Sequence, residues 1–368
     1  MIIKSLELKN YRNYSDLSIE LSNGINLFYG DNAQGKTNIL ESLYMAATAR
    51  SHRGSKDRDI IAFGEEEAHI KVTVEKRGSI FRIDMHIKKH KAKGIAINSV
   101  PIRKASELFG SVNIVFFSPE DLGIIKKGPA ERRKFMDFEL CQLDKVYLNA
   151  LINYNKILIH RNKLLKELAF RSDWKETLDI WDMQLLRFGK EMIRGREEFI
   201  KTLNPIIFKI HDELTKGREK IRIRYEKNTE ADSFETLLRN SRESDIKTKI
   251  SNIGPHRDDI SFIIEDEKNS PIDLKTYGSQ GQQRTAALSL KLAEIEMIQK
   301  ITGDLPVLLL DDVLSELDHK RQEALISSIR HLQTMITCTG VEDYISKNFD
   351  LDKIIRVRDG KIYPESFS

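Results

Sequence analysis

The sequence predicts an α/β fold that carries a helical insertion, and three observations support this prediction. Near the N-terminus, Gly30–Thr37 reads GDNAQGKT, a complete G-x-x-x-x-G-K-[ST] motif. Far downstream, the apolar run Val307–Leu310 ends in two acids, Asp311 and Asp312. Between them, the segment 142–215 is long, rich in charged residues and nearly free of glycine, which is typical of helices.

The first motif lies in the context that a phosphate-binding loop requires. Ile25–Tyr29 is a short apolar run that predicts a strand, and residues 36–49 have apolar side chains at helical spacing. Glycines allow backbone N–H groups to curl around phosphate oxygens, at the positive end of the following helix. Lys36 is expected to neutralise the β- and γ-phosphates, and the Thr37 hydroxyl to hold Mg²⁺. A chance glycine-rich turn would not explain both flanking elements.

Length and composition place limits on the class of protein. A chain of 368 residues is long enough for about two domains. Its net charge of +4 favours nucleic acid only weakly, and Cys141 and Cys338 form no metal or disulfide pattern. The N-terminus does not read as a signal peptide, and the longest apolar run is far too short to span a membrane. We therefore expect a cytoplasmic protein.

The rest of the chain alternates between strand and helix patterns. Residues 1–30 predict short strands, and residues 68–99 predict a β-meander with a turn over Lys88–Gly94. Leu151, Leu158 and Leu165 recur every seven residues, so residues 142–215 predict a short antiparallel arm that turns near 170–174. Pro205 predicts a kink or the start of another helix. Residues 221–265 again alternate as strands.

The downstream acidic run fits a Walker B element. We expect its apolar strand to lie beside the phosphate-loop strand and to bring Asp311 to the Mg²⁺ at the carboxyl end of the sheet. Asp312 would then polarise the attacking water. A core strand followed by a helix-capping acid would give the same pattern, but the upstream phosphate loop favours the nucleotide site.

A second anion-binding element precedes an amphipathic helix. Ser279-Gln280-Gly281-Gln282 comes directly before an apolar-striped segment that ends near Lys300. A serine and a glycine before a helix form an anion-binding N-terminus, although an ordinary N-cap has the same composition.

The order of these elements resembles the ABC/SMC class of ATPase heads. Within that class, further stretches are similar to the RecF family of bacterial recombination and repair proteins. The similar stretches are LKNYRNY at 8–14, GDNAQGKTNILE at 30–41, ARSHR at 49–53, FSPEDL at 117–122, GPHRDD at 254–259, GSQGQQRT at 278–285 and LLLDDVLSELD at 308–318.

The resemblance implies an ABC-type head of two lobes. Lobe one would comprise residues 1–118 together with 300–368, and helical lobe two residues 119–299 with the arm at 142–215. The resemblance assigns ATP contacts to Arg12, Gly30, Asp31, Asn32, Ala33, Gln34, Gly35, Lys36, Thr37 and Asn38. Thr37 and Asp311 would hold Mg²⁺, and Lys36 and Asp312 would act in catalysis. Residues acting across a head-to-tail dimer would be Ser279, Gln280, Gly281 and Gln282 of the signature loop, with Ser315 and Asp318 of the D-loop.

Four departures from the class pattern affect these expectations. The signature loop reads SQGQ, with Gln280 where transporters have glycine. Asp312 replaces the usual glutamate and is one methylene shorter, so we expect slow hydrolysis. The strand around Met335–Gly340 lacks the switch histidine, for which Thr337 or Thr339 would substitute, and no glutamine fits the Q-loop.

The resemblance also implies a DNA partner. ATP binding would drive homodimerisation on duplex near single-strand gaps and help to load recombinase together with RecR and RecO. Basic clusters would neutralise DNA phosphates without reading sequence. The candidate contacts are Arg50, Arg53, Lys56, Lys88, Lys89 and Lys91, in clusters that also contain Arg58 and Lys93, with a further cluster at Lys126, Lys127, Arg132, Arg133 and Lys134. His256 and Arg257 lack metal-ligand spacing, so a positioning role is expected.

Three competing functions fit parts of the sequence. A transporter ATPase subunit would have an SGGQ loop, a switch histidine and a shorter chain. A small-molecule kinase would not need a signature loop. A DNA-binding scaffold that uses ATP only as a structural ligand stays open if Asp312 is a poor base.

Overall fold

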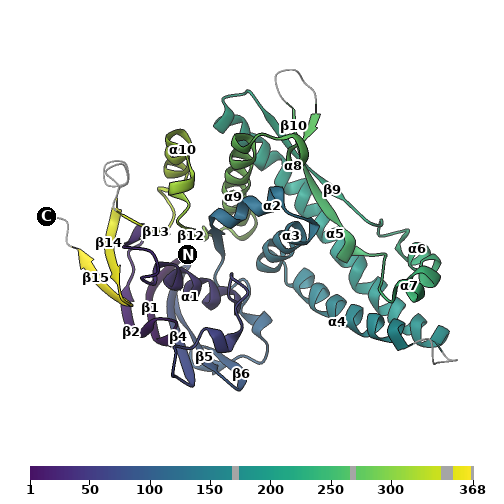
Figure 1. The fold of residues 1–368 in the computed structure, drawn as a ribbon, viewed down its shortest axis with the longest axis horizontal. Helices are drawn as coiled ribbons and strands as arrows, with labels where there is room; N and C mark the ends of the chain where they lie inside the picture. Colours follow the sequence, from purple (N-terminus) through teal and green to yellow (C-terminus); the bar gives the residue numbers. More distant parts are fainter. Residues whose placement is uncertain (168–173, 266–270, 341–350, 366–368) are drawn as a thin grey trace. The chain divides into compact units, whose positions relative to one another are not determined.

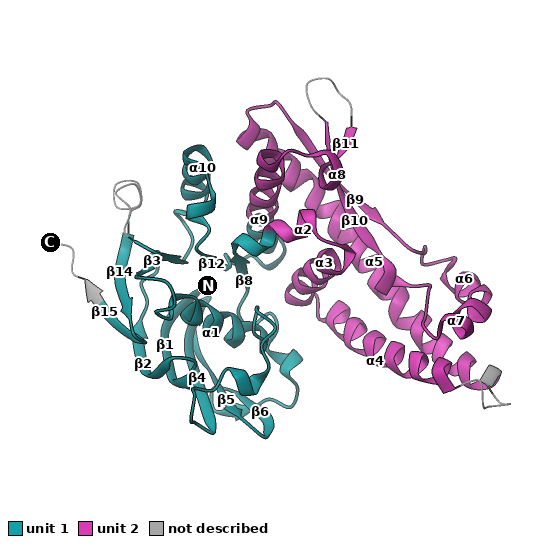
Figure 2. Ribbon diagram, viewed as in Figure 1, with its two compact units in different colours: residues 1–121, 294–368 teal, residues 122–293 magenta. Residues whose placement is uncertain are grey.

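The computed structural model describes residues 1–167, 174–265, 271–340 and 351–365. The chain divides into two compact units, one formed by Met1–Asp121 and Glu294–Ser368 and the other by Leu122–Ala293 (Figure 2). Both ends of the chain therefore contribute to the first unit, and the long middle segment forms the second.

The first unit contains a six-stranded sheet with the strand order β15-β14-β3-β13-β12-β8. All neighbouring pairs are parallel except the β14–β15 pair at the edge. The strands are β3 (Ile25–Tyr29), β8 (Ile114–Phe117), β12 (Val307–Asp311), β13 (Thr334–Cys338), β14 (Leu351–Arg358) and β15 (Lys361–Glu365). Since these parallel strands share one direction, the phosphate loop and the two acids leave the sheet at the same edge.

The Walker B strand does not lie beside the phosphate-loop strand, so this part of the prediction was wrong. Strand β13 is inserted between β3 and β12. Thr337 on β13 is paired with Phe28 on one side and with Asp311 on the other. A threonine hydroxyl is thereby placed at the centre of the edge where the site forms.

A second sheet in the first unit has the order β2-β1-β4-β5-β6-β7. Its strands are β1 (Ile2–Tyr11), β2 (Tyr14–Glu20), β4 (Glu67–Lys76), β5 (Ser79–Lys88), β6 (Lys91–Ile97) and β7 (Val100–Pro101). Buried and partly exposed residues alternate along β4, so one face covers the core. Helix α1 (Lys36–Thr48) contacts strands of both sheets and contributes to the main apolar cluster.

The turn of the β5–β6 hairpin is shorter than the sequence suggested. Lys88 pairs with Lys91, so the turn consists of Lys89 and His90 alone. The lysine-rich segment continues the strand instead of forming a long loop, and Lys93 points inward to bind Ala49 O at 2.6 Å and Asp57 Oδ1 at 2.7 Å.

The second unit is mainly helical and includes the expected antiparallel arm (Figure 1). Helix α4 (Lys145–Glu167) packs against α5 (Trp174–Thr215), and the expected turn lies outside the described residues. Helix α5 continues through Pro205, so no new helix starts there. The other elements of this unit are α2 (Leu122–Lys126), α3 (Pro129–Leu143), β9 (Lys220–Glu226), α6 (Phe234–Asn240), α7 (Arg242–Thr248), β10 (Asp259–Glu265), β11 (Pro271–Asp273) and α8 (Leu274–Tyr277).

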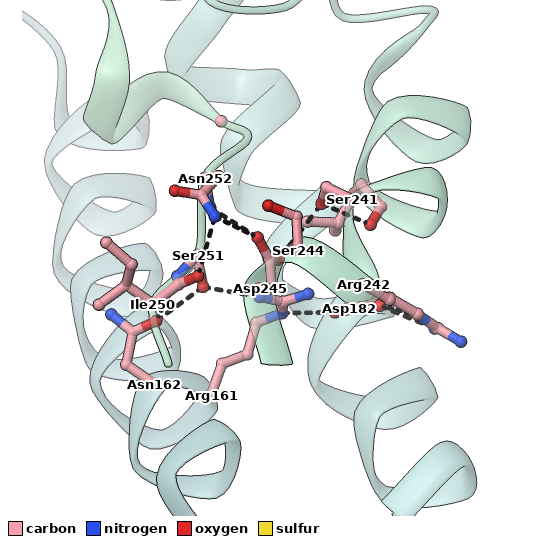
Figure 3. A network of polar contacts seen from close by, with 12 residues as sticks. Arg161, Asn162, Asp182, Ser241, Arg242, Ser244, Asp245, Ile250, Ser251 and Asn252 are labelled. Atoms are coloured by element: carbon pink, nitrogen blue, oxygen red, sulfur yellow. Dashed lines mark hydrogen bonds and ion pairs between the residues drawn. The ribbon is translucent and has the colours of Figure 1, made fainter. Parts of the chain in front are cut away.

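A buried polar network joins the arm helices to α7 (Figure 3). Arg161 on α4 donates to Asp182 on α5 at 2.6 Å and to Asp245 on α7 at 2.7 Å. It also donates to Ser251 Oγ at 2.7 Å. Arg242 reaches the second oxygen of Asp182 at 2.7 Å. Because these charges are removed from water, each depends on its partners.

Helix α9 (Gln280–Thr302) begins in the second unit and ends in the first, and α10 (His319–Ile329) follows the Walker B strand. Short 3₁₀ turns complete the described elements at Asp57–Asp59, Ala105–Leu108, Pro119–Asp121, Pro255–Arg257 and Leu314–Glu316. Among the helices in the described ranges, none combines the length and the apolar character needed to cross a bilayer.

Candidate nucleotide-binding site

The phosphate loop follows β3 and leads into α1, and two of its glycines adopt conformations that other residues rarely take. Gly30 has φ +150° and Gly35 has φ +115°. A Cβ on Gly30 would lie 2.3 Å from Val357 O, and one on Gly35 would lie 2.5 Å from Asn13 Nδ2. Both steric space and backbone conformation therefore require glycine here.

Residues from both ends of the chain hold this loop in place. Asn13 Nδ2 donates to Gln34 O at 2.8 Å, and Tyr14 OH donates to Gly35 O at 3.0 Å. From the C-terminal hairpin, Asp359 N donates to Gln34 Oε1 at 2.6 Å. Sequence reasoning missed these contacts because Asn13, Tyr14 and Asp359 lie outside the loop motif and distant from it in sequence.

Lys36 lies over the loop as the motif requires. Its ammonium group donates to Gly30 O at 2.7 Å and to Asp31 O at 2.8 Å, and only 4% of the residue is exposed. A nearly buried cation bounded by backbone carbonyls and helix-start N–H groups is suited to an anionic phosphate group.

The metal-binding candidates meet at the carboxyl edge of the parallel sheet. Thr37 Oγ1 donates to Asp311 Oδ1 at 2.8 Å, and Thr337 Oγ1 donates to the same oxygen at 2.8 Å. Burial raises the pKa of Asp311, and the two threonine hydrogen bonds oppose that rise. A hydroxyl and a carboxylate side by side are hard oxygen ligands of the kind that Mg²⁺ prefers.

Asp312 occupies a strained position directly after the strand. Its φ is +52°, which is unusual for a residue other than glycine. Its N–H donates to Thr337 Oγ1 at 3.0 Å, and its carbonyl accepts from Ser315 Oγ at 2.7 Å. Asp318 caps α10 by accepting from Arg321 N at 3.1 Å. Of the two D-loop candidates, Ser315 thus stabilises the turn that carries Asp312, and Asp318 stabilises the start of α10.

Arg12, which the resemblance assigns to an ATP contact, is held by an acidic partner. Its guanidinium makes a bidentate contact to Glu41 on α1, at 2.7 and 2.9 Å, and also donates to Asp59 O at 2.7 Å. Ser51 Oγ donates to Glu41 Oε1 as well, at 2.5 Å. Burial alone would raise the pKa of Glu41, but the hydrogen bonds from Arg12 and Ser51 lower it below its usual value. The pair therefore fixes the turn between β1 and β2 to the phosphate-loop helix.

Among the candidate DNA contacts, Arg53 is hydrogen-bonded to the residue that follows the phosphate loop. Arg53 Nη1 donates at 3.2 Å to Asn38 Oδ1, and Asn38 Nδ2 donates to Asn13 Oδ1 at 2.9 Å. The positive charge of Arg53 also acts to lower the pKa of Asp311. This position makes Arg53 part of the nucleotide-site surroundings, a role that sequence reasoning did not assign.

The remaining basic residues differ in how accessible they are to DNA. Arg50, Lys56 and Lys91 are exposed. Lys88 and Lys89 also pair with Glu67 at 3.5 Å and with Glu66 at 3.0 Å. In the second unit, Arg132 is nearly buried and paired with Asp259, and Arg133 donates to Asp258 O. The interpretation of Arg132 as a surface phosphate contact was therefore wrong.

The signature loop is stabilised by reciprocal hydrogen bonds at the start of α9. Ser279 N donates to Gln282 Oε1 at 2.8 Å, and Gln282 N donates to Ser279 Oγ at 3.2 Å. This arrangement is a capping box, so the Ser279 side chain lies at the helix N-terminus beside the first N–H groups of α9. Gln280 and Gly281 form the first turn of this helix.

Glu219 connects the signature loop to the arm, and no local sequence pattern indicated this role. Glu219 Oε1 accepts from Gln282 Nε2 at 3.1 Å, and its other oxygen lies 3.4 Å from His211 Nε2 at the end of α5. His211 Nδ1 lies 2.9 Å from Ser289 Oγ on α9. The contact with His211 is the main cause that lowers the pKa of Glu219. The C-terminus of the arm helix and the signature helix are thus joined through polar side chains.

His256 has a positioning role within the second unit. Its Nδ1 lies 2.7 Å from Tyr154 OH, and its Nε2 lies 2.9 Å from Ser251 O. Burial lowers the pKa of His256 to about 4. Arg257 donates to Ser251 O at 3.0 Å. Both side chains therefore brace the loop between α7 and β10.

The chain has the architecture of an ABC/SMC-type ATPase head. A family model described as RecF/RecN/SMC N terminal domain matches residues 2–362. Two solved SMC head domains have the same fold, with TM-scores of 0.60 and 0.58 at 17% and 18% identity, each over 100% of this chain and 98% and 96% of theirs.

Proteins with higher sequence identity to this chain identify its family within this class. "DNA replication and repair protein RecF" of Lachnospira eligens is 57% identical over 100% of both chains, and that of Clostridium perfringens is 46% identical over 98% of this chain and 99% of its own. A structure of the recombination mediator protein RecF with ATP matches with a TM-score of 0.91 and 34% identity, over 99% of this chain and 98% of that one. The chain belongs to the RecF family.

Proposed function

We propose that this protein is an ATP-dependent DNA-binding ATPase of recombinational repair and replication restart. One observation carries the nucleotide part of the proposal: Thr37, Asp311 and Thr337 converge beside a glycine loop that Lys36 covers. A relative of this chain has been solved with ATP, which supports the same ligand here. Residues 30–38 would bind the triphosphate.

Mg²⁺ fits the oxygen ligands at this site. Thr37 and Asp311 would hold the ion, which would neutralise negative charge on the bound triphosphate. Lys36 would exchange its carbonyl contacts for phosphate oxygens. The two threonine hydrogen bonds keep Asp311 oriented and favour its ionised form, in which it binds a cation.

Hydrolysis would be slow and stimulated by DNA. In the ABC/SMC class, the acid that follows the Walker B aspartate orients the attacking water, and here that acid is Asp312. Its side chain is one methylene shorter than that of glutamate. Its backbone is fixed by Thr337 and Ser315, so the short side chain cannot be compensated by a shift of the turn. We therefore expect a low rate rather than an absence of turnover.

ATP would act across two copies of the chain. The loop Ser279–Gln282 presents a serine and helix N–H groups that suit a γ-phosphate held by another copy, with Ser315 and Asp318 meeting the same interface. Since ATP would bind the dimer more tightly than the monomer, mass action shifts the chain toward a dimer. Hydrolysis would remove the shared phosphate and release the two copies.

DNA is the proposed partner of this dimer. Exposed Arg50, Lys56 and Lys91, together with Lys88, Lys89 and Arg53, would contact backbone phosphates of duplex near single-strand gaps. The solved relative is described as a mediator in the RecFOR pathway. This description supports RecR and RecO as partners in loading recombinase, in the cytoplasm.

A non-hydrolysing, ATP-liganded scaffold is the second candidate function, and the short Asp312 side chain is the observation that favours it. A transporter subunit is disfavoured by the SQGQ loop and by Thr337 in the switch strand. Hydrolysis by the wild type and by Asp312→Asn, with and without DNA, separates the enzyme from the scaffold. A rate that Asp312→Asn leaves unchanged would favour the scaffold.

The decisive experiment measures mass in solution without nucleotide, with ADP and with ATP–Mg²⁺, each with and without gapped DNA. A dimer that forms only with ATP, is strengthened by DNA and is lost in Ser279→Arg supports the proposal. Ser244→Arg, at an exposed serine on α7, controls for the added arginine. A monomer under every condition would contradict the head-to-tail dimer.

A further inference from the structure

A cluster of three metal-ligating side chains lies on the second sheet of the first unit, outside the nucleotide site. Glu67 and His69 lie on β4, and His86 lies opposite His69 on β5. Alternation places all three on the solvent face, because the neighbouring Ala68, Ile70 and Ile87 are buried. Within the described ranges, this is the one group of three such residues whose ligand atoms all lie within 4.8 Å of one another.

The distances fit a tetrahedral ion. His86 Nε2 lies 2.9 Å from Glu67 Oε2, and His69 Nε2 lies 3.7 Å from Glu67 Oε1. An ion with bonds of about 2.0–2.1 Å to nitrogen and oxygen requires ligand atoms about 3.3 Å apart. The two distances, which run to different oxygens of one carboxylate, each differ from this value by about 0.4 Å. Both Nε2 atoms approach the same carboxylate, that of Glu67. The two imidazoles stack with centroids 4.0 Å apart.

The surroundings leave room for an ion and for a further ligand. Across the sheet from His86 lies Gly94, which has no side chain, while Lys9 lies across from His69. Both histidines also line a hollow of about 470 Å³. Lys88 Nζ lies 3.5 Å from Glu67 Oε2, so a cation at this carboxylate would take the place of that ammonium group.

We propose that Glu67, His69 and His86 form a binding site for a divalent transition-metal ion such as Zn²⁺, with the fourth position open to water. Two imidazoles and one carboxylate select such ions over Mg²⁺ and Ca²⁺, which prefer oxygen ligands. Cross-strand ligands also join β4 to β5, so binding would stabilise this hairpin. The inference rests on these contacts alone and does not depend on the proposed function.

The test is titration of the full chain with Zn²⁺ by calorimetry, without nucleotide and with excess Mg²⁺ to occupy hard-oxygen sites. Co²⁺ absorption reports the ligand geometry in parallel. We expect saturable binding that raises the midpoint of thermal unfolding. His69→Ala, His86→Ala and Glu67→Gln should each weaken binding about 10- to 100-fold or more, because even changes outside the ligand shell have effects of this size.

His90→Ala provides a matched control, since His90 is exposed at the turn of the same hairpin and is not one of the three clustered residues. It should bind Zn²⁺ like the wild type. Glu67→Gln changes one atom of an exposed side chain and should fold normally, as circular dichroism would show. Binding that is not saturable, or that is equal in the wild type and all three ligand variants, would overturn the proposal.

Discussion

Thr37 and Asp311, which are 274 positions apart in sequence, are joined by a hydrogen bond of 2.8 Å. The first residue ends the phosphate loop, and the second ends a strand from the C-terminal part of the chain. Thr337 completes the contact by donating to the same carboxylate oxygen. This small oxygen cluster turns two sequence motifs into a single site.

We expect Thr337→Val to weaken Mg²⁺-dependent ATP binding by about tenfold, because a buried carboxylate would lose one of its hydrogen bonds. Without that bond, the pKa of Asp311 would rise further, so the carboxylate would become protonated at a higher pH. Binding in the variant should therefore fail at a higher pH than in the wild type. Fluorescent-nucleotide titration with Mg²⁺, repeated over a range of pH, measures both effects.

Thr236→Val is the matched control for this change, because Thr236 is an exposed threonine on α6 and has no assigned role in the nucleotide site. It should match the wild type at each pH. Equal loss in the two variants would show that Thr337 has no special contact with the site.

We expect Glu219→Ala to weaken ATP-dependent dimerisation by about tenfold or more without changing ATP binding by the monomer. Gln282 would lose its charged acceptor, and a hydrogen bond to a charged group contributes about 1.5–3 kcal/mol. Sedimentation at several ATP concentrations measures the dimer. Glu226→Ala, an exposed acid on β9, should leave it intact. If Glu219→Ala dimerises normally, the contact does not orient the signature loop.

We expect Arg161→Met to lower the free energy of unfolding by about 3–5 kcal/mol, because Asp182 and Asp245 would keep buried charges without their common partner. Urea denaturation of the full chain measures this loss. Arg194→Met removes an exposed pair with Glu191 and should cost less than about 1 kcal/mol. Similar losses in both variants would argue against the network in Figure 3 as the cause.

Acid should destabilise the second unit through His256. The pKa of His256 falls from 6.5 to about 4 on folding, so the unfolded chain binds more protons between these values. Stability is complete above pH 6.5 and is lost as the pH falls toward 4, with about 2 kcal/mol lost by pH 5.

His256→Gln should remove this part of the pH dependence, whereas His90→Gln, at an exposed turn, should retain it. Urea unfolding at pH 7.5 and pH 5 provides the comparison. A pH profile that is the same in His256→Gln and the wild type would contradict the assignment to this histidine.

The sequence predicted the elements whose signals are local. The glycine loop, the apolar strand before Asp311 and the meander were each found from a few adjacent residues, and the structure confirms these elements. The position of β13 between β3 and β12 could not be found in this way, because strand order depends on contacts between distant segments. Glu219 was missed for the same reason, since it meets Gln282 across 63 positions.

Clusters of basic residues in the sequence were the least reliable guide to which residues contact a ligand. Arg132 and Lys93 look like surface cations in the sequence, yet both are held by acidic partners. Arg53 was assigned by composition to DNA, and only the fold shows its contact with Asn38. A basic residue can be assigned to a ligand only after its internal partners are known.

The placement of β3 has a consequence for biosynthesis. Both neighbours of this strand, β13 and β14, come from the last part of the chain, whereas β3 is made near the beginning. A ribosome must therefore complete most of the polypeptide before the phosphate-loop strand can find either partner. During that interval an apolar strand remains unpaired, so the nascent chain is expected to need protection from aggregation until its final segments emerge.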